Sequence, residues 1–178
     1  MLAAITQVLN QNSDTQVDVC MTSEMARRIE LWTAMYEDNA PWVDRKKVKS
    51  AQLPAAIASE VARLVTLEMK SEITGGSSAA YLNDQYQKKV LKNIRRYVEY
   101  GCAKGSLILK PYVTKTGLAI QYVQADCFFP LAFDDSGQIQ QCVFTEQFRK
   151  GQKIYTRLEV HTLQGEQIRI TNRAFVAT

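Results

Sequence analysis

The chain has 178 residues, of which 46% are hydrophobic and 22% charged. This balance suits a globular domain with enough apolar mass for a core, and it excludes a chain that is disordered over most of its length. The net charge of +4 comes from 22 basic and 18 acidic side chains. Dedicated DNA-binding domains concentrate basic residues far more strongly, so the charge permits a nucleic-acid neighbour without requiring one.

Four scattered cysteines and a single histidine limit the metal and redox chemistry. No C-x-x-C spacing occurs among the cysteines, and there is no set of histidines to complete a zinc site. The cysteines are Cys20, Cys102, Cys127 and Cys142. We therefore expect reduced thiols, no disulfide and no metal. No apolar stretch is long enough to span a membrane, and no charged residue precedes Asp14, so the basic start of a signal peptide is missing. These features predict a cytoplasmic protein with no membrane partner.

The first half of the chain is predicted to be helical. Residues 1–9 favour a short helix, and a second begins at Thr22 or Ser23, either of which is a good N-cap. Its apolar residues recur at three- and four-residue spacing up to Tyr36, and Pro41 marks its end.

Two further helices are predicted before residue 101. Pro54 suits the first turn of the third helix, which has a broad apolar face. The run 74–78 is rich in glycine and serine and favours a loop. A fourth helix is then predicted from about 79 to 100, with Gly101 placed to close it in a left-handed cap.

The remainder changes to the two-residue period of strands, separated by short polar turns that force neighbours to run antiparallel. The predicted strands cover 106–113, 118–124, 128–133, 139–149, 154–163 and 167–175. The fold class is therefore α+β, with N-terminal helices followed by an antiparallel β-meander. We divide the chain into an N-terminal segment, 1–21, and one domain, 22–178, with a helical part at 22–101 and a β part at 105–176.

The turn between the third and fourth strands sets a register that can be tested. A hairpin turning at Asp135–Ser136 places Cys142 opposite Phe129 and Cys127 near Phe144. Asp134 and Asp135 could pair as metal ligands or as a catalytic acid and base, but Asp-Asp-Ser-Gly is also what a hairpin turn requires, and we favour the turn.

No catalytic constellation is recognisable in the sequence. His161 alternates with its neighbours in a strand and has no nucleophile motif or second histidine. Gly75–Gly76 and the pair Gly101 and Gly105 lack the Gly-Lys-Ser/Thr of a phosphate loop. We therefore expect neither enzymatic activity nor a bound cofactor.

Two basic arrays are the candidate contacts to DNA or to an acidic partner. Both also suit a solvated surface, which we favour, because acidic residues dilute the second array and no stacking motif accompanies either. The arrays are a loop cluster and a helix-face cluster: Arg45, Lys46, Lys47 and Lys49; and Lys88, Lys92, Arg95 and Arg96. The aromatic residues Trp32, Tyr36 and Trp42 suit core anchors, although aromatic side chains are also enriched at subunit interfaces.

Six blocks in order resemble the portal proteins of tailed phages from Gram-positive hosts. They are 29–32 with 35–36, 53–58, 62–68, 100–105, 123–128 and 155–159, and the resemblance covers most of residues 20 to 175.

The resemblance implies a structural subunit of a ring, typically of twelve copies, at one vertex of the virion capsid. In that family a terminase pumps DNA through the ring, and the head-to-tail connector and the capsid proteins contact it. The matching region is the outer wing of the subunit, so the resemblance implies other portal subunits as partners and a place at the virion vertex or in the host bacterial cytoplasm.

The length departs from the family, whose members have several hundred residues. The stem, clip and crown have no counterpart here, which favours either an excised domain or a truncated prophage gene product. Two alternatives stay open: a non-catalytic interaction or scaffold module, and a weak, non-specific nucleic-acid-binding domain.

Overall fold

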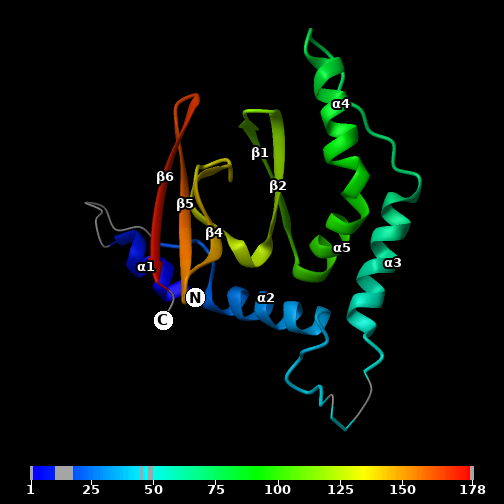
Figure 1. Cartoon of the computed structure of the whole chain (residues 1–178), viewed down its shortest axis with the longest axis vertical. Helices are drawn as coiled ribbons and strands as arrows, with labels where there is room; N and C mark the ends of the chain where they lie inside the picture. The colour runs from blue at the N-terminus through cyan, green and yellow to red at the C-terminus, as the bar shows by residue number, and fades with distance from the viewer. Residues whose placement is uncertain (1, 11–17, 45, 48–49, 177–178) are drawn as a thin grey trace. The chain divides into compact units, whose positions relative to one another are not determined.

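The computed structural model describes residues 2–10, 18–44, 46–47 and 50–176, and side chains from Ile5 onward. Its described residues form two compact units, which are drawn in Figure 1. The first joins the described residues of 1–28 with those of 126–178, and the second comprises those of 29–125. The helix α2 (Ser23–Tyr36) contributes to both units, because the division falls after Arg28.

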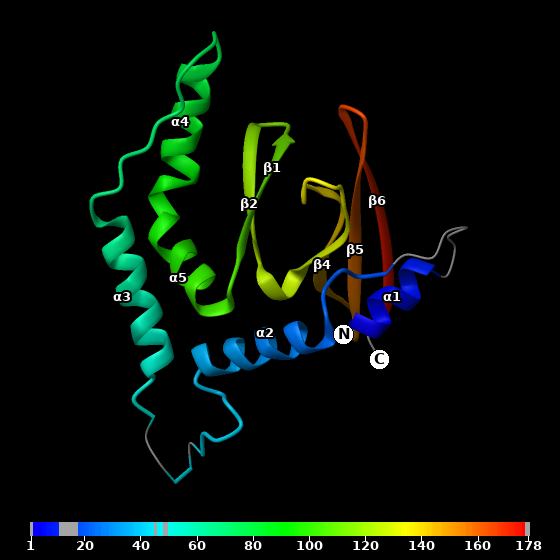
Figure 2. The same cartoon turned by 180° about the vertical axis from the view of Figure 1, so that it is seen from behind.

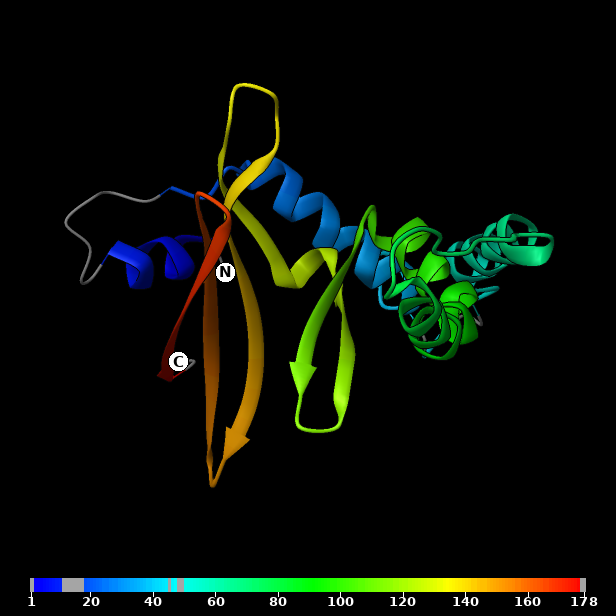
Figure 3. The same cartoon turned by 90° about the horizontal axis from the view of Figure 1, so that it is seen from above.

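The first unit is a four-stranded antiparallel sheet with the helix α1 (Leu2–Asn10) on one face. The strands follow the chain in the order β3-β4-β5-β6, and their bounds are Phe128–Phe133, Ile139–Lys150, Lys153–Gln164 and Gln167–Val176. Figure 2 shows α1 beside β5 and β6, and Figure 3 shows the twist between these two strands.

The core of this unit lies between α1 and one face of the sheet. Ile5 and Leu9 of α1 pack with inward residues that alternate along the strands, as the two-residue period requires. The strand residues of this core are Phe129, Leu131, Val143, Leu158 and Val160. Arg173 of β6 fastens α1 to the sheet, because its Nη1 donates to the carbonyl oxygens of Val8 at 3.0 Å and Leu9 at 2.7 Å.

The second unit combines helices with a two-stranded hairpin. It contains α3 (Leu53–Leu67), α4 (Ala79–Lys89), the short 3₁₀ helix η1 (Leu91–Asn93), α5 (Ile94–Lys104), β1 (Leu107–Thr114) and β2 (Gly117–Gln124). Ala58 and Ala62 are the buried residues of α3, and their small side chains let α3 lie close alongside α5 (Figure 1). A second 3₁₀ helix, η2 (Ala125–Cys127), follows β2.

The fold class α+β is confirmed, and the six strands lie within one residue or so of their predicted bounds. They form two sheets: β1 pairs only with β2, and the other four strands make the meander. The predicted cap at Thr22 is also confirmed, since its Oγ1 accepts a hydrogen bond from the amide of Met25 at 3.1 Å. Pro54 occupies the first turn of α3 as predicted.

The prediction of one helix over 79–100 is wrong, because the helix breaks at Val90. The hydroxyl of Tyr122 donates to the carbonyl oxygen of Lys89. The amide of Asn93, which would bind that oxygen in a continuous α-helix, donates to the carbonyl oxygen of Val90 instead. A tertiary hydrogen bond thus replaces an intrahelical one. Gly101 does not cap the helix either: α5 continues to Lys104, and Gly105, with φ of 90°, is the left-handed cap.

The predicted register of β3 and β4 is wrong by one residue. Phe129 lies opposite Val143, Cys142 lies opposite Pro130, and Phe144 lies opposite Phe128. The cause is the turn, which spans Asp134 to Gln138 and therefore centres on Ser136. Its Asp134 accepts hydrogen bonds from Ser136 and Gln138, as expected of a turn aspartate. All four cysteines lie in the described part of the chain, and no disulfide joins any two of them.

Among the described residues, no helix has the length and apolar character that crossing a membrane requires.

Candidate functional site

The break between α4 and α5 opens a hollow in the second unit. The hollow has a volume of about 470 Å³ and is lined by basic, aromatic and small apolar side chains. Its lining residues are Lys88, Lys89, Lys92, Asn93, Tyr97, Ala119, Ile120 and Tyr122. We call it the basic hollow.

Two tyrosines form the aromatic side of the basic hollow. The rings of Tyr97, from α5, and Tyr122, from β2, stack face to face at an interplanar angle of 5°. Burial raises the pKa of Tyr122, with a further contribution from Tyr97, so its hydroxyl stays protonated and donates to Lys89. The stack therefore holds the helix break against the hairpin.

The lysines of the basic hollow differ in how strongly they are engaged. The Nζ of Lys89 donates to the carbonyl oxygen of Leu118, and that of Lys88 lies 2.7 Å from a carboxylate oxygen of Asp84. Lys92 is exposed at the rim. A cation at this rim is suited to phosphate or carboxylate, and the hollow as a whole is suited to an anionic ligand.

The helix-face array predicted from the sequence divides in the structure. Lys88 and Lys92 line the basic hollow, whereas Arg95 and Arg96 do not. Arg96 donates from Nε to the hydroxyl of Tyr100 at 3.0 Å and lies over that ring, and Arg95 lies close enough to Glu60 of α3 to lower its pKa after the stronger effect of Arg63. Two of the four residues thus lie at the basic hollow.

The loop array is only partly within the described residues. Arg45 and Lys49 lie outside them. Lys46 and Lys47 are exposed, and the Nζ of Lys47 lies 3.3 Å from Asp44.

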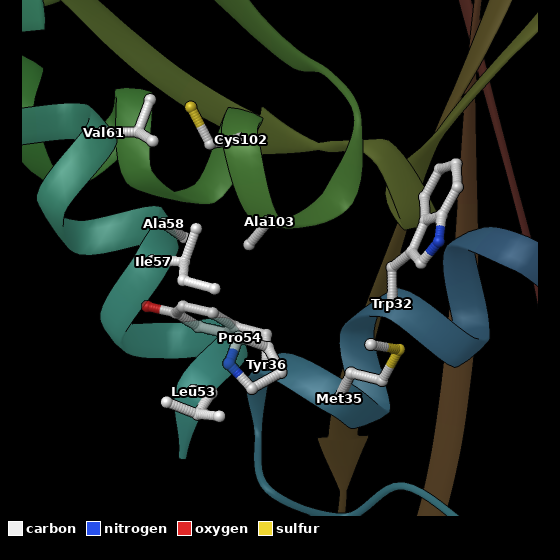
Figure 4. A pocket seen from close by; sticks show the side chains of 10 residues that line it. All are labelled: Trp32, Met35, Tyr36, Leu53, Pro54, Ile57, Ala58, Val61, Cys102 and Ala103. Atoms are coloured by element: carbon white, nitrogen blue, oxygen red, sulfur yellow. The ribbon is translucent and has the colours of Figure 1, made fainter. Parts of the chain in front are cut away.

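An apolar groove lies on the same unit, where α2, α3 and α5 meet. It has a volume of about 340 Å³, and Figure 4 shows its side chains, which come from the three helices. They are Trp32, Met35, Tyr36, Leu53, Pro54, Ile57, Ala58, Val61, Cys102 and Ala103.

The groove continues onto an exposed apolar stripe of α3. Leu53 and Ile57 are each 62% exposed, Leu64 is 58% exposed and Val65 is 59% exposed. Isolated apolar residues are ordinary on a protein surface, whereas contiguous apolar sets are a common feature of interaction sites. We call these residues and the groove together the α3 surface.

Tyr36 supplies the polar group at the groove. Its hydroxyl donates to a carboxylate oxygen of Glu99 at 2.7 Å, and burial, reinforced by this hydrogen bond, raises its pKa. The ring is thereby fixed between α2 and α5, with one face available to the groove. An apolar body with one anchored hydroxyl is typical of side chains at protein interfaces.

Sequence reasoning identified the aromatic residues Trp32 and Tyr36 but not the groove that they line. The sequence did indicate such a groove through the broad apolar face of α3, which is wider than one neighbouring helix can cover. It did not identify Lys89, Asn93, Tyr97 or Tyr122 as one site, because the helix break that gathers them depends on a strand about 30 residues later in the chain.

The lone histidine and the possible metal ligands identified in the sequence have ordinary structural positions. His161 is on β5, with Nε2 2.7 Å from Glu159 and its ring edge-on to Phe144. Within the described ranges, no three His, Cys, Asp or Glu side chains gather as metal ligands would.

No family model, no curated protein and no solved structure matches the chain.

Proposed function

We propose that the chain is a structural subunit of a phage portal, in which the α3 surface is a contact with a neighbouring subunit or a connector protein. The observation that supports this most is the contiguous apolar set on α3, four of whose side chains are more than half exposed. A subunit of a permanent assembly carries such a surface, because it is buried only when the neighbour is present.

The chemistry of the groove also favours a protein neighbour over a small molecule. Its lining is largely apolar, its residues come from three helices, and the hydroxyl of Tyr36 supplies an anchored polar group. A ring subunit needs a heterologous contact, in which a patch on one copy meets a different patch on the next. A groove that accepts a protruding apolar element fits one half of such a contact.

The proposal is tested by counting the chain in phage particles. Cells that carry the gene are induced, heads are purified, and peptides of this chain are quantified against isotope-labelled standards. The portal resemblance predicts about twelve copies per head, and antibody-gold particles at a single vertex. Heads that lack the chain, or contain it at the copy number of a major capsid protein, would contradict the proposal.

A variant pair tests the α3 surface in the same assay. A tagged copy with Ile57→Asp places a carboxylate in the groove and is expected to be excluded from heads, because burying an unpaired charge is costly. A tagged copy with Val113→Asp is the control, since Val113 is 84% exposed on β1 and outside the groove. Equal incorporation of the two tagged copies would show that the α3 surface is not part of the subunit contact.

A further inference from the structure

The two edges of the four-stranded sheet differ in how well they are protected. At one edge, β3 contains Pro130, its pairing with β4 is irregular from Pro130 to Phe133, and the carbonyl oxygen of Pro130 accepts a hydrogen bond from the amide of Cys20 at 2.8 Å. Proline, bulges and covering segments are the usual means of preventing a strand from adding to an edge.

The other edge, β6, is less protected, although it carries two charged residues, Arg169 and Arg173. It pairs with β5 over ten consecutive residues without a register shift, and its sequence contains no proline. Within the described residues, no strand pairs with its outer side. A long regular edge of this kind offers its backbone amides and carbonyls to another strand.

The side chains of β6 divide between the two faces of the sheet. Arg173 and Phe175 face the α1 side, where Arg173 is held by the carbonyls of Val8 and Leu9 and Phe175 packs on the core. On the opposite face, Ile168 is 61% exposed and Ile170 52% exposed, and Ala174 and Val176 follow them. This exposed row is apolar, with Asn172 at its centre.

We propose that β6 is a dimerisation edge, at which the β6 strand of a second copy of this chain adds antiparallel with Asn172 on the two-fold axis. The sheets of the two copies then form one sheet of eight strands, and about nine backbone hydrogen bonds join them.

Complementarity of the strand with itself selects this partner and this register. With Asn172 opposite Asn172 of the second copy, Ile168 meets Val176 and Ile170 meets Ala174, so apolar residues oppose apolar residues. On the other face, Arg169 meets Phe175 and Thr171 meets Arg173. No like charges are opposed, whereas centring on Thr171 would place Arg169 opposite Arg173, which is unfavourable.

A pair of double variants tests the register while sparing the fold. Within one copy, Ile170 lies beside His161 and Ala174 beside Arg157, so glutamates at both positions have favourable neighbours. Across the two-fold axis, position 170 of each copy faces position 174 of the other. The variant Ile170→Glu with Ala174→Glu therefore places two pairs of glutamates opposite each other. The matched variant, Ile170→Lys with Ala174→Glu, opposes Lys to Glu twice at the same positions.

Sedimentation of the whole chain over a micromolar range is the measurement. We expect a monomer–dimer equilibrium for the natural chain. The dimer dissociation constant of the Glu/Glu variant should be about tenfold higher than that of the natural chain, and that of the Lys/Glu variant should lie within about threefold of it. A natural chain that stays monomeric throughout, or equal weakening by both variants, would overturn the proposal.

Cross-linking gives a second, independent readout. Asn172→Cys places two thiols on the axis with Cα atoms about 5 Å apart, which is within the range for a disulfide. Ile168→Cys is the control, because its two copies lie eight residues out of register, about 27 Å apart. The first variant should give a covalent dimer on mild oxidation, above the background of the natural chain, and the second should not.

The same experiments separate this edge from the α3 surface. A dimer that Ile57→Asp abolishes and the Glu/Glu variant leaves intact would place the contact on α3 and refute the β6 assignment. A dimer lost only in the Glu/Glu variant supports β6 and leaves the proposed portal contact to its own test.

Discussion

Two glycines four residues apart on α5 show how one backbone angle decides where a helix ends. Gly105 has φ of 90°, and a Cβ there would lie 3.2 Å from the Cζ3 atom of Trp32. Gly101 lies inside the helix, where a Cβ would make an ordinary contact at 3.6 Å with Leu107. The sequence predicts the cap at Gly101, and the backbone conformation shows that it lies at Gly105.

We therefore expect opposite results from the same substitution at the two positions. Gly105→Ala should lower the free energy of unfolding by about 1–2 kcal/mol, because alanine is strained in the left-handed region and crowds Trp32. Gly101→Ala should leave it unchanged or raise it by up to about 1 kcal/mol, since alanine favours the helix. Urea titration measures both, and a destabilised Gly101→Ala would contradict the assigned end of α5.

The hydrogen bond of Tyr36 beside the groove should make the stability of the protein depend on pH. Replacing it with phenylalanine removes the hydrogen bond to Glu99 and should cost about 1 kcal/mol at neutral pH. Because the folded-state pKa of Tyr36 is raised above the unfolded value of about 10, its contribution is complete below pH 10 and is lost as the pH rises toward the folded-state pKa. The Tm of the natural chain should thus fall more steeply above pH 10 than that of Tyr36→Phe, as measured by circular dichroism. Parallel curves would show that the Tyr36 hydroxyl is not protected.

At the scale of the element, α1 is too short to be stable alone, and its position depends on the sheet. Its last carbonyls, at Val8 and Leu9, accept hydrogen bonds from Arg173, which brings a positive charge to the C-terminal end of the helix dipole.

Arg173→Ala should therefore release α1 while the sheet stays folded. We expect a loss of about 2 kcal/mol in unfolding free energy and faster amide exchange confined to α1. Arg169→Ala, on the same strand, is the control and should change stability by less than about 0.5 kcal/mol. Hydrogen exchange read by mass spectrometry distinguishes the two variants, and unaltered protection of α1 in Arg173→Ala would contradict this role.

The elements that could be predicted from sequence are those whose determinants are local. The cap at Thr22, the proline in the first turn of α3 and the strand bounds follow from residues within each element. The break at Val90 could not be predicted, since it depends on the hydroxyl of Tyr122. The register of β3 and β4 failed for a similar reason: one more residue in the turn, set by hydrogen bonds to Asp134, moves every pair by one.

At the scale of the whole molecule, the candidate sites require elements that are distant in sequence. The groove joins side chains from α2, α3 and α5, and the basic hollow joins α4, η1, α5 and β2. The periodicity of α3 indicated that its apolar face was broad, but not which part the neighbouring helix would leave uncovered. The sequence likewise placed Lys88, Lys92, Arg95 and Arg96 on one helix face, and of these four the structure brings Lys88 and Lys92 to the basic hollow.

The division of the basic residues bears directly on binding to DNA. Lys88 and Lys92 lie at the basic hollow, whereas Arg96 lies over the ring of Tyr100, so we expect only a few cations to contact one stretch of phosphates. A protein that makes about three phosphate contacts has a salt slope of about −2.7, so its affinity falls roughly 40-fold between 50 and 200 mM salt.

We therefore expect binding to DNA that is weak, independent of sequence and lost at physiological salt. Fluorescence anisotropy with labelled duplexes of two unrelated sequences measures the affinity and its salt dependence. Lys88→Ala with Lys92→Ala should weaken binding at low salt and lower the slope by about 2, because each lysine lost removes one phosphate contact. Lys115→Ala, in the turn between β1 and β2 and outside the hollow, is the control and should change little. A tight complex at physiological salt that prefers one sequence would instead favour a nucleic-acid-binding domain over the proposed structural role.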